Sequence, residues 1–297
     1  MTQPSPAPET LPHELHVRKL EVDLSTGFER HWHGGDAFRS MFFNALSMSF
    51  PVGEQFFIDS VRGALKRLPE EPRHTALRET ILGFIGQEAT HRRVHALYNE
   101  QLDHQGLINR WQHWAQRRIE RARQLKPLHP LAVTCAYEHC TAVLADVTLR
   151  HDALLAGAEP RMQTLWRWHA AEETEHGAVA FDLYQALGGN LTWRRRWFTY
   201  VLVIFSLDCL GQTLLNLKHD GSLWRLSTWR SALRFMLGRN GVLRLSVPAL
   251  LRYYRADFHP ALQADSPPAR GEHAGVSAQQ LAERWLQANA DRYRVLR

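Results

Sequence analysis

The sequence predicts an all-α protein, organised as a four-helix bundle with additional C-terminal helices. Two observations lead to this fold class. From residue 36 to 187, apolar and charged residues recur at helical spacings in long segments, separated by proline, glycine and short polar clusters. No run of alternating β-branched residues competes with this pattern, so the core is expected to be helical.

Helical periodicity places five helices before residue 190, over residues 36–68, 73–104, 108–125, 130–155 and 160–187. Pro51 lies inside the first and is expected to kink or split it, because proline removes one backbone hydrogen bond and clashes with the preceding turn. Pro130 and Pro160 stand at helix starts, where proline is tolerated, and Gly188 and Gly189 close the last helix.

Composition divides the chain into four parts. Residues 1–30 begin with a Pro-rich stretch that has no apolar core of a signal peptide, and we expect a largely disordered tail there. Residues 31–190 form the bundle. Residues 191–262 form an apolar and basic helical extension, packed on the bundle or on a membrane surface, and residues 263–297 a linker and a C-terminal helix.

The extension contains two unusual segments. Residues 197–210, WFTYVLVIFSLDCL, are the most apolar stretch of the chain, but they are too short and too interrupted by Asp208 to be assigned as a membrane-spanning helix. A buried helix packed on the bundle and an interfacial anchor are the two alternatives. Residues 223–255 interleave arginine with Leu, Trp and Tyr at helical spacing, which fits either a helix on anionic lipid or a helix with solvated arginines.

Charge and cysteine content restrict the partners and the compartment. The net charge is +6, and 16 Lys and Arg face 7 Asp and Glu after residue 190, which hints at an anionic surface such as a membrane. Nucleic acid is not expected, because no RNA-binding aromatic motif or zinc-finger spacing accompanies this charge. Three cysteines without a CxxC pair fit a protein of the reducing cytoplasm. A peripheral position at the inner membrane and a homodimer are both left open.

The stretch WRWHAAEETEHGAVAFD, residues 166–182, carries the first candidate ligands. Residues advance by about 100° along a helix, so with His169 at zero, Glu173 lies near +40° and His176 near −20°. These three residues therefore share one face. Glu175 falls at about −120° and is expected to be a supporting or surface group, whereas Glu172, at about −60°, is not excluded by angle.

The pair Glu-x-x-His occurs again as Glu88 and His91 in FIGQEATHRRVHALYNE, with His95 one turn further along. A dinuclear carboxylate centre needs two such helices and one glutamate from each of two others. Glu54 in FPVGEQFFIDS and Glu138 in VTCAYEHCTAVLAD occur where the helix order requires them, 34 and 35 residues before the next Glu-x-x-His glutamate. Both have apolar neighbours, and a buried carboxylate there is costly unless it is paired or binds a cation.

This order of residues is similar to that of the ferritin-like di-iron carboxylate proteins, and the additional His169 to that of the aryl-amine N-oxygenases. The blocks FPVGEQFF, FIGQEATHRRVH, YEHCTA, WHAAEETEH with AFDLY, and YYRADFHP resemble the bacterial family catalogued as predicted metal-dependent hydrolases, from about residue 15 to 262. The resemblance implies a ferritin-like bundle with two metal ions. The implied ligands are Glu54, Glu88, His91, Glu138, His169, Glu173 and His176. His95, His139 and Glu172 are the candidate supporting groups around these ligands, and for His95 and Glu172 direct binding to the metal is the open alternative.

A ligand set of nitrogen and oxygen atoms, rich in carboxylates, suits two iron ions, with manganese or zinc as alternatives. Three functions follow: an O₂-dependent oxygenase or hydroxylase, a hydrolase that uses metal-activated water, as the family description suggests, and metal storage or oxidation. Apolar flanks, and small residues such as Thr141 and Ala142 beside Glu138, favour the first function and an apolar or lipid-like small-molecule substrate.

Overall fold

The structure is a computed structural model that describes residues 15–122, 124–261 and 275–296. Within these residues the fold is all-α apart from one small two-stranded sheet, which confirms the predicted class. The first helices are α1 (Ala37–Leu65), α2 (Thr75–His104), α3 (Trp111–Ala122), α4 (Leu128–Arg150), α5 (Pro160–His176) and α6 (Val179–Ala186). The later helices are α7 (Leu191–Asp220), α8 (Leu226–Leu237), α9 (Val242–Leu251) and α10 (Ala278–Ala288), and the strands are β1 (Arg18–Leu20) and β2 (Tyr293–Val295).

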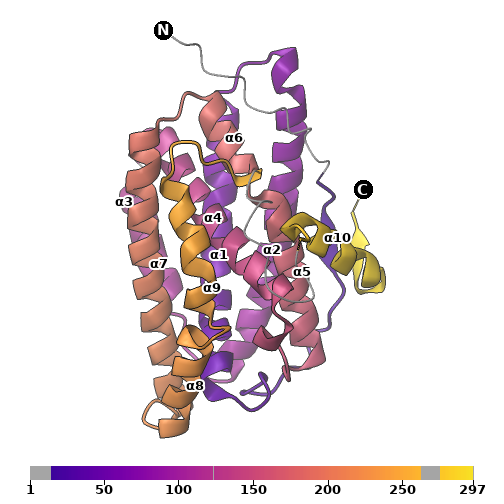
Figure 1. Cartoon of the computed structure of the whole chain (residues 1–297), viewed down its shortest axis with the longest axis vertical. Helices are drawn as coiled ribbons and strands as arrows, with labels where there is room; N and C mark the ends of the chain where they lie inside the picture. The colour runs from indigo at the N-terminus through magenta and orange to yellow at the C-terminus, as the bar shows by residue number, and fades with distance from the viewer. Residues whose placement is uncertain (1–14, 123, 262–274, 297) are drawn as a thin grey trace.

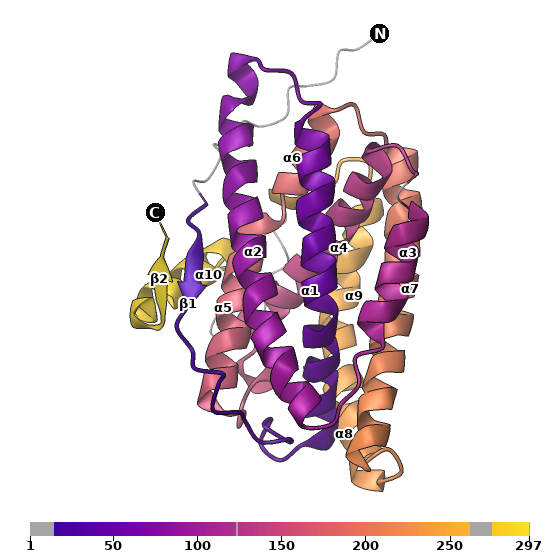
Figure 2. The same ribbon diagram turned by 180° about the vertical axis from the view of Figure 1, so that it is seen from behind.

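Four long helices form the bundle that surrounds the candidate site. Helix α1 packs against α2 and α4, and α5 packs against α4 and α2, which closes the ring of four (Figure 1). Helices α7, α8 and α9 cover the outer side of α1 and α4, and α3 lies against α1 and α7 (Figure 2). The central helices are therefore shielded by a second layer of helices on that side.

Helix α1 continues through Pro51 without a break, so of the two predicted outcomes, a kink or a split, the split is wrong. Proline at position 51 removes the hydrogen bond that its backbone nitrogen would donate to the carbonyl oxygen of Ser47. That oxygen instead accepts a hydrogen bond of 3.0 Å from the side-chain amide of Asn99 on α2. Because the neighbouring helix satisfies the orphaned carbonyl, the helix can tolerate the proline.

The predicted helix over residues 160–187 is two helices in the structure. Helix α5 ends at His176, and α6 begins at Val179 after a turn at Gly177 and Ala178. Glycine is a poor helix former, so the helix is interrupted at Gly177 and α6 begins as a separate helix. Helix α6 then packs against α4 and α2.

The prediction of a largely disordered tail over residues 1–30 is wrong for the C-terminal half of this range. Residues 1–14 lie outside the described residues, but Arg18–Leu20 form strand β1, which pairs antiparallel with β2 so that Arg18 faces Val295. Leu20 and Leu24 are buried in the core, and so is the side chain of Arg18. In the last part of the chain, most of the predicted linker also lies outside the described residues, and α10 packs on α5 and α4.

Helix α7 has features of both predicted alternatives, a helix packed on the bundle and an interfacial anchor, on its two faces. Phe198, Val201 and Leu217 are fully buried against the bundle, as expected for a packed helix. Yet among the described residues α7 is the one helix long and apolar enough to cross a membrane, judged by length and composition alone. Core helices of soluble proteins have the same character.

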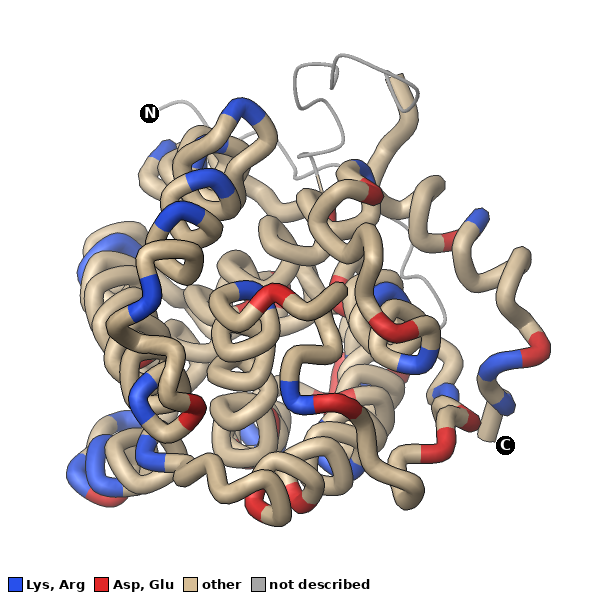
Figure 3. The backbone as a smooth tube through the Cα atoms, turned by 90° about the horizontal axis from the view of Figure 1, so that it is seen from below, with Lys and Arg blue, Asp and Glu red and all other residues tan. Residues whose placement is uncertain are grey.

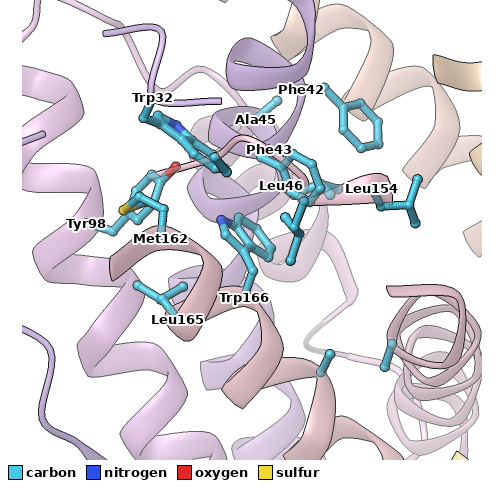
Figure 4. Close-up of a cluster of buried hydrophobic side chains, with 14 of the residues drawn as sticks. Trp32, Phe42, Phe43, Ala45, Leu46, Tyr98, Leu154, Met162, Leu165 and Trp166 are labelled. Atoms are coloured by element: carbon cyan, nitrogen blue, oxygen red, sulfur yellow. The ribbon is translucent and has the colours of Figure 1, made fainter. Parts of the chain in front are cut away.

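An aromatic cluster fills the bundle on one side of the predicted ligands. Figure 4 shows Trp32, Phe43 and Tyr98 gathered around Trp166, with Met162 and Leu165 of the same helix beside them. The ring of Trp166 lies 5.5 Å from the ring of His95. The rotamer of that histidine is therefore restricted by close packing as well as by hydrogen bonds.

Candidate metal centre

All seven predicted ligands are buried in the middle of the bundle, and their exposed fractions are at most 4%. Helix α1 supplies Glu54, α2 supplies Glu88 and His91, α4 supplies Glu138, and α5 supplies the remaining three. The structure thus brings together residues that are far apart in the sequence. That they bind metal stays a prediction.

On α5, spacings of three and four residues put His169, Glu173 and His176 on one face of the helix. His169 Nε2 lies 3.0 Å from Glu173 Oε1, and His176 Nδ1 lies 3.7 Å from the same oxygen. The carboxylate of Glu173 therefore stands between the two imidazoles.

Helix α2 adds the second Glu-x-x-His pair opposite α5. Glu88 Oε1 lies 2.9 Å from His176 Nδ1, and His91 Nδ1 lies 3.4 Å from Glu173 Oε1. One ligand atom from each of Glu88, His91, Glu173 and His176 lies within 4.8 Å of all the others. Two imidazole nitrogens and two carboxylates at this separation can surround one cation.

The two single glutamates approach from the other helices. Glu54 groups with His95 and His169, again with one ligand atom from each residue within 4.8 Å of the others. Glu138 Oε2 lies 3.9 Å from His176 Nδ1. The centre therefore extends over more than one group of ligands, which is what two neighbouring ions require.

Hydrogen bonds at the outer side of the centre fix the tautomer of His176. Its Nε2 donates to the side-chain oxygen of Gln87 at 2.8 Å, because a carbonyl oxygen only accepts. The amide nitrogen of Gln87 in turn donates to Glu175 at 2.7 Å, which orients the amide. In the neutral imidazole, Nδ1 of His176 then carries no proton and presents a lone pair to the centre.

His91 is held in the same way by a carboxylate. Its Nε2 donates to Glu172 at 2.8 Å, and Arg18 of strand β1 donates to both Glu172 and Glu175 at 3.1 and 3.0 Å. A carboxylate that accepts from the outer nitrogen fixes the ring and makes the inner nitrogen a better ligand. In the neutral imidazole, Nδ1 of His91 therefore also faces the centre without a proton.

His169 is oriented by a chain of polar groups that crosses from α5 to α2 and α1. The hydroxyl of Ser47 donates to Asn99 and accepts from Nδ1 of His95, with both distances 2.9 Å. Nε2 of His95 is then free to accept from Nδ1 of His169 at 2.6 Å. This leaves Nε2 of His169 without a proton, facing Glu173, and shows how His95 can orient His169.

The carboxylates at the centre lack the partners that buried charges need. Both side-chain oxygens of Glu54, Glu88 and Glu138 and one oxygen of Glu173 accept no hydrogen bond from any residue that the structure describes. Such groups are costly in a protein interior unless a cation compensates them. Four carboxylates with three neutral imidazoles are balanced by two divalent cations, so this donor set fits a dimetal centre.

The ionisation of these groups without metal reflects the same crowding. Burial and the neighbouring Glu88 raise the pKa of Glu54 and of Glu138 well above its usual range. Burial also favours the neutral form of Glu173, but the surrounding imidazoles hold its pKa well below the usual value. Burial and His91 lower the pKa of His169 to about 4, which keeps this imidazole neutral at pH 7.

The three predicted supporting residues have different positions. Glu172 and His95 contact the predicted ligands, through His91 and His169 respectively. His139 does not take the expected place: it packs against Tyr253 and Phe258 and hydrogen bonds to the carbonyl oxygen of Leu250 at 3.3 Å. It points to the extension because it lies about 100° around α4 from Glu138, and burial lowers its pKa to about 4.

Two polar residues at the centre were not expected from the sequence. Gln87 precedes Glu88 directly and gave no signal apart from its polarity in an otherwise apolar turn. Arg18 lies in the part of the chain expected to be disordered, and it is brought to Glu172 and Glu175 only by the pairing of β1 with β2. The sequence contains one signal for such an arginine. Glu172 and Glu175 lie beside the predicted ligands, and a buried pair of acids needs a cation that the neighbouring sequence does not supply.

Comparison with known proteins agrees with this geometry. A family model described as predicted metal-dependent hydrolase matches residues 16–264, which is most of the chain. No curated protein and no solved structure matches. The matched range includes Arg18 and Gln87 as well as all seven predicted ligands.

Proposed function

The chain belongs to the family of predicted metal-dependent hydrolases, and we propose that it is a dimetal enzyme that uses two iron ions and O₂ to oxidise an apolar small molecule. The metal dependence comes from the family and the buried cluster. The choice of iron and of O₂ rests on the ligand chemistry and on the surroundings of the cluster.

The observation that carries this proposal is a small apolar chamber at the cluster. A cavity of about 60 Å³ is lined by His169 and Glu173, and its other walls are mainly aromatic and aliphatic, among them Phe43, Phe50 and Trp166. A reactive oxidant must be kept from water, and an apolar chamber supports this. Hydrolysis, in contrast, needs water beside the metal.

Iron, when bound, would supply the electrons that reduce O₂. The protein's own residues hold the charge and the protons in place. Arg18 neutralises part of the charge of Glu172 and Glu175, so the outer acids do not compete for the metal. Ser47 and His95 keep the proton of His169 on the outer nitrogen, so the inner nitrogen stays available as a ligand.

Hydrolysis is the second candidate, and the family description favours it. In that case manganese or zinc would lower the pKa of a bound water, which would attack an ester, amide or phosphate. Metal storage or oxidation has weaker support, because ions would need a polar route and the chamber at His169 and Glu173 is mainly apolar.

Metal analysis combined with O₂ uptake separates these candidates. The purified protein is expected to bind about two iron ions per chain, and its anaerobically prepared ferrous form should consume O₂ with a transient visible absorption on rapid mixing. A zinc-loaded sample is the control and should consume none. Less than about one iron or manganese per chain with stoichiometric zinc, or esterase turnover that survives under nitrogen, would overturn the oxygenase proposal.

We also propose that residues 191–255 contact an anionic membrane surface at the periphery, which would place a cytoplasmic enzyme at the inner membrane. The outer face of α7 carries Tyr200, Val203, Leu207 and Leu210, all more than 40% exposed. These residues follow one another at helical spacing over about 15 Å. Helices α8 and α9 and the turn before α8 extend the apolar surface with exposed Leu and Trp side chains, including Trp224, Leu226, Leu233 and Leu251.

Basic residues surround this apolar surface. Residues 191–255 contain 11 Lys and Arg and 2 Asp. In Figure 3 the Lys and Arg positions are concentrated along the left side of the tube, where few acidic positions lie. Apolar side chains bordered by arginines complement an anionic lipid surface, whereas a second copy of the same basic face would repel it.

Sedimentation with vesicles tests this contact. The protein is expected to bind phosphatidylglycerol vesicles and not phosphatidylcholine vesicles, and high salt should weaken binding because exposed charges are screened. Replacing Leu207 and Leu210 with glutamate should abolish binding, whereas replacing Leu82, which is exposed on α2, should not. Equal binding of the double variant, or a homodimer in solution that buries this face, would contradict the proposal.

A further inference from the structure

We propose that the cavity between α1, α3, α4 and α7 binds a single-chain anionic amphiphile, with the apolar tail inside and the anionic head beside Arg121. The cavity has a volume of about 460 Å³, within the usual range for small-molecule sites. This inference rests on the proposed function, because it names the substrate class of the same centre.

The walls of the cavity suit an apolar tail. Each of the four helices contributes aromatic or aliphatic side chains, and the main ones are Phe56, Phe57, Trp111, Val133, Tyr137 and Phe205. The polar side chains of Ser49, Thr141, Arg118 and Arg121 make up the small remainder. A solute that fills this space with methylene groups gains burial of apolar surface and leaves few of its own polar groups unpaired.

The inner end of the cavity lies beside the predicted metal ligands. Phe50, Thr141 and Phe205 line both this cavity and the small chamber that reaches His169 and Glu173. The ring of Phe50 lies 4.7 Å from the ring of His169. Phe50 is therefore the shared wall between the tail cavity and the metal chamber, and a tail that lies along it ends near the cluster.

The outer end is marked by positive charge on α3. Arg118 forms an ion pair with Asp208 of α7, so its charge is already balanced. Arg121 is exposed and lines the cavity, and it forms no ion pair with any residue that the structure describes. A carboxylate or phosphate held there completes the pairing of this guanidinium.

Equilibrium binding of dodecanoate to the metal-loaded protein tests the inference, followed by the fluorescence of Trp111 and Trp197, which line the cavity. Dodecanol serves as the uncharged probe, and a short two-chain phosphatidylglycerol as the lipid probe. We expect dodecanoate to bind more tightly than either. Tighter binding of the two-chain lipid would overturn the assignment to a single-chain ligand.

Two variants test the two ends of the site. Gly53 lines the cavity, and an added Cβ would meet its nearest neighbour, Phe57, at an ordinary distance of 3.8 Å. Gly53→Leu should therefore fill the cavity while it favours the helix, and should weaken both single-chain probes at least about tenfold. Arg121→Gln should weaken dodecanoate about tenfold and leave dodecanol unchanged, because only the charged head loses a partner.

Arg117→Gln is the matched control, since Arg117 is exposed on the same helix and does not line the cavity. Unchanged dodecanoate binding in Gly53→Leu would overturn the cavity assignment, and equal loss in Arg117→Gln and Arg121→Gln would overturn the role of Arg121. Metal content and O₂ uptake are measured on the same samples. If O₂ uptake fails while dodecanoate still binds the cavity, the proposed function is wrong and the binding site stands.

Discussion

Replacing Glu173 with alanine is expected to abolish metal binding. The carboxylate lies 3.0, 3.4 and 3.7 Å from nitrogens of His169, His91 and His176, so it contacts all three imidazoles. Its removal leaves these nitrogens without their shared anionic neighbour, and a cluster that loses a central carboxylate binds divalent cations far more weakly. Metal analysis of the purified variant, after dialysis against buffer without metal, measures the loss.

Glu175→Gln is the matched control, two residues along the same helix. Its side chain accepts from Arg18 and Gln87 outside the ligand set, so both metal ions should remain. Loss of such an outer partner typically lowers metal affinity by about 10–100-fold, which a competition experiment with a chelator detects. If Glu175→Gln loses its metal as completely as Glu173→Ala, the assignment of ligands on α5 is wrong.

Removing the metal is expected to lower the melting temperature by about 10 °C at neutral pH. Ions that bind only the folded state at a large excess over their dissociation constant stabilise it by roughly 4 kcal/mol. For a domain of 150–250 residues each kcal/mol corresponds to about 2–4 °C. Calorimetry before and after treatment with a chelator measures the difference, and Glu173→Ala, which should not respond to the chelator, is the control.

The loss of stability on metal removal is expected to grow as the pH rises. Burial raises the pKa of Glu54, Glu88 and Glu138 in the metal-free fold, and carboxylate partners raise that of His91 and His176 although burial opposes this. A group whose pKa is higher in the folded than in the unfolded state makes its full contribution to the stability of the fold below the unfolded pKa. This contribution is lost as the pH rises through the folded-state pKa.

The unfolded value is 6.5 for histidine, so His91 and His176 should make the metal-free protein lose stability as the pH rises above about 6.5. Below pH 6.5 the lowered pKa values of His169 and His139 act in the opposite direction, so the decline is expected only above that pH. Glu173, whose pKa is lowered, acts in the opposite direction only below about pH 4.5. The metal-loaded protein should not show this decline, since the cations replace the protons. A metal-free melting temperature that is constant or rises above about pH 6.5 would contradict the charge arrangement described for the centre.

The sequence was sufficient for the helical class and for the assembly of the seven candidate ligands. Spacings of three and four residues decide which side chains share a face of α5, and the structure has His169, Glu173 and His176 together for that reason. The inward direction of Glu54 and Glu138 follows from their apolar neighbours, since a solvated glutamate would have polar ones. These inferences need only local geometry.

What the sequence did not reveal depends on contacts between distant residues. The tautomer of His169 is determined by Ser47 and Asn99 on two other helices, and no local pattern connects these three positions. The continuity of α1 at Pro51 likewise depends on Asn99 of α2. Helix propensity predicts the conformation that a segment prefers in isolation. The tautomer of His169 and the continuity of α1 are instead decided by contacts with neighbouring helices.

The contact of Arg18 with the acids beside the centre depends on how far synthesis of the chain on the ribosome has advanced. The arginine belongs to strand β1, and that strand pairs with residues as far along as Val295. A ribosome therefore releases all seven ligands long before the partner strand that holds Arg18 beside Glu172 and Glu175 exists. Arg18 reaches these acids only when the strand pair closes, so the ordered, metal-ready state requires a chain that has been synthesised as far as strand β2.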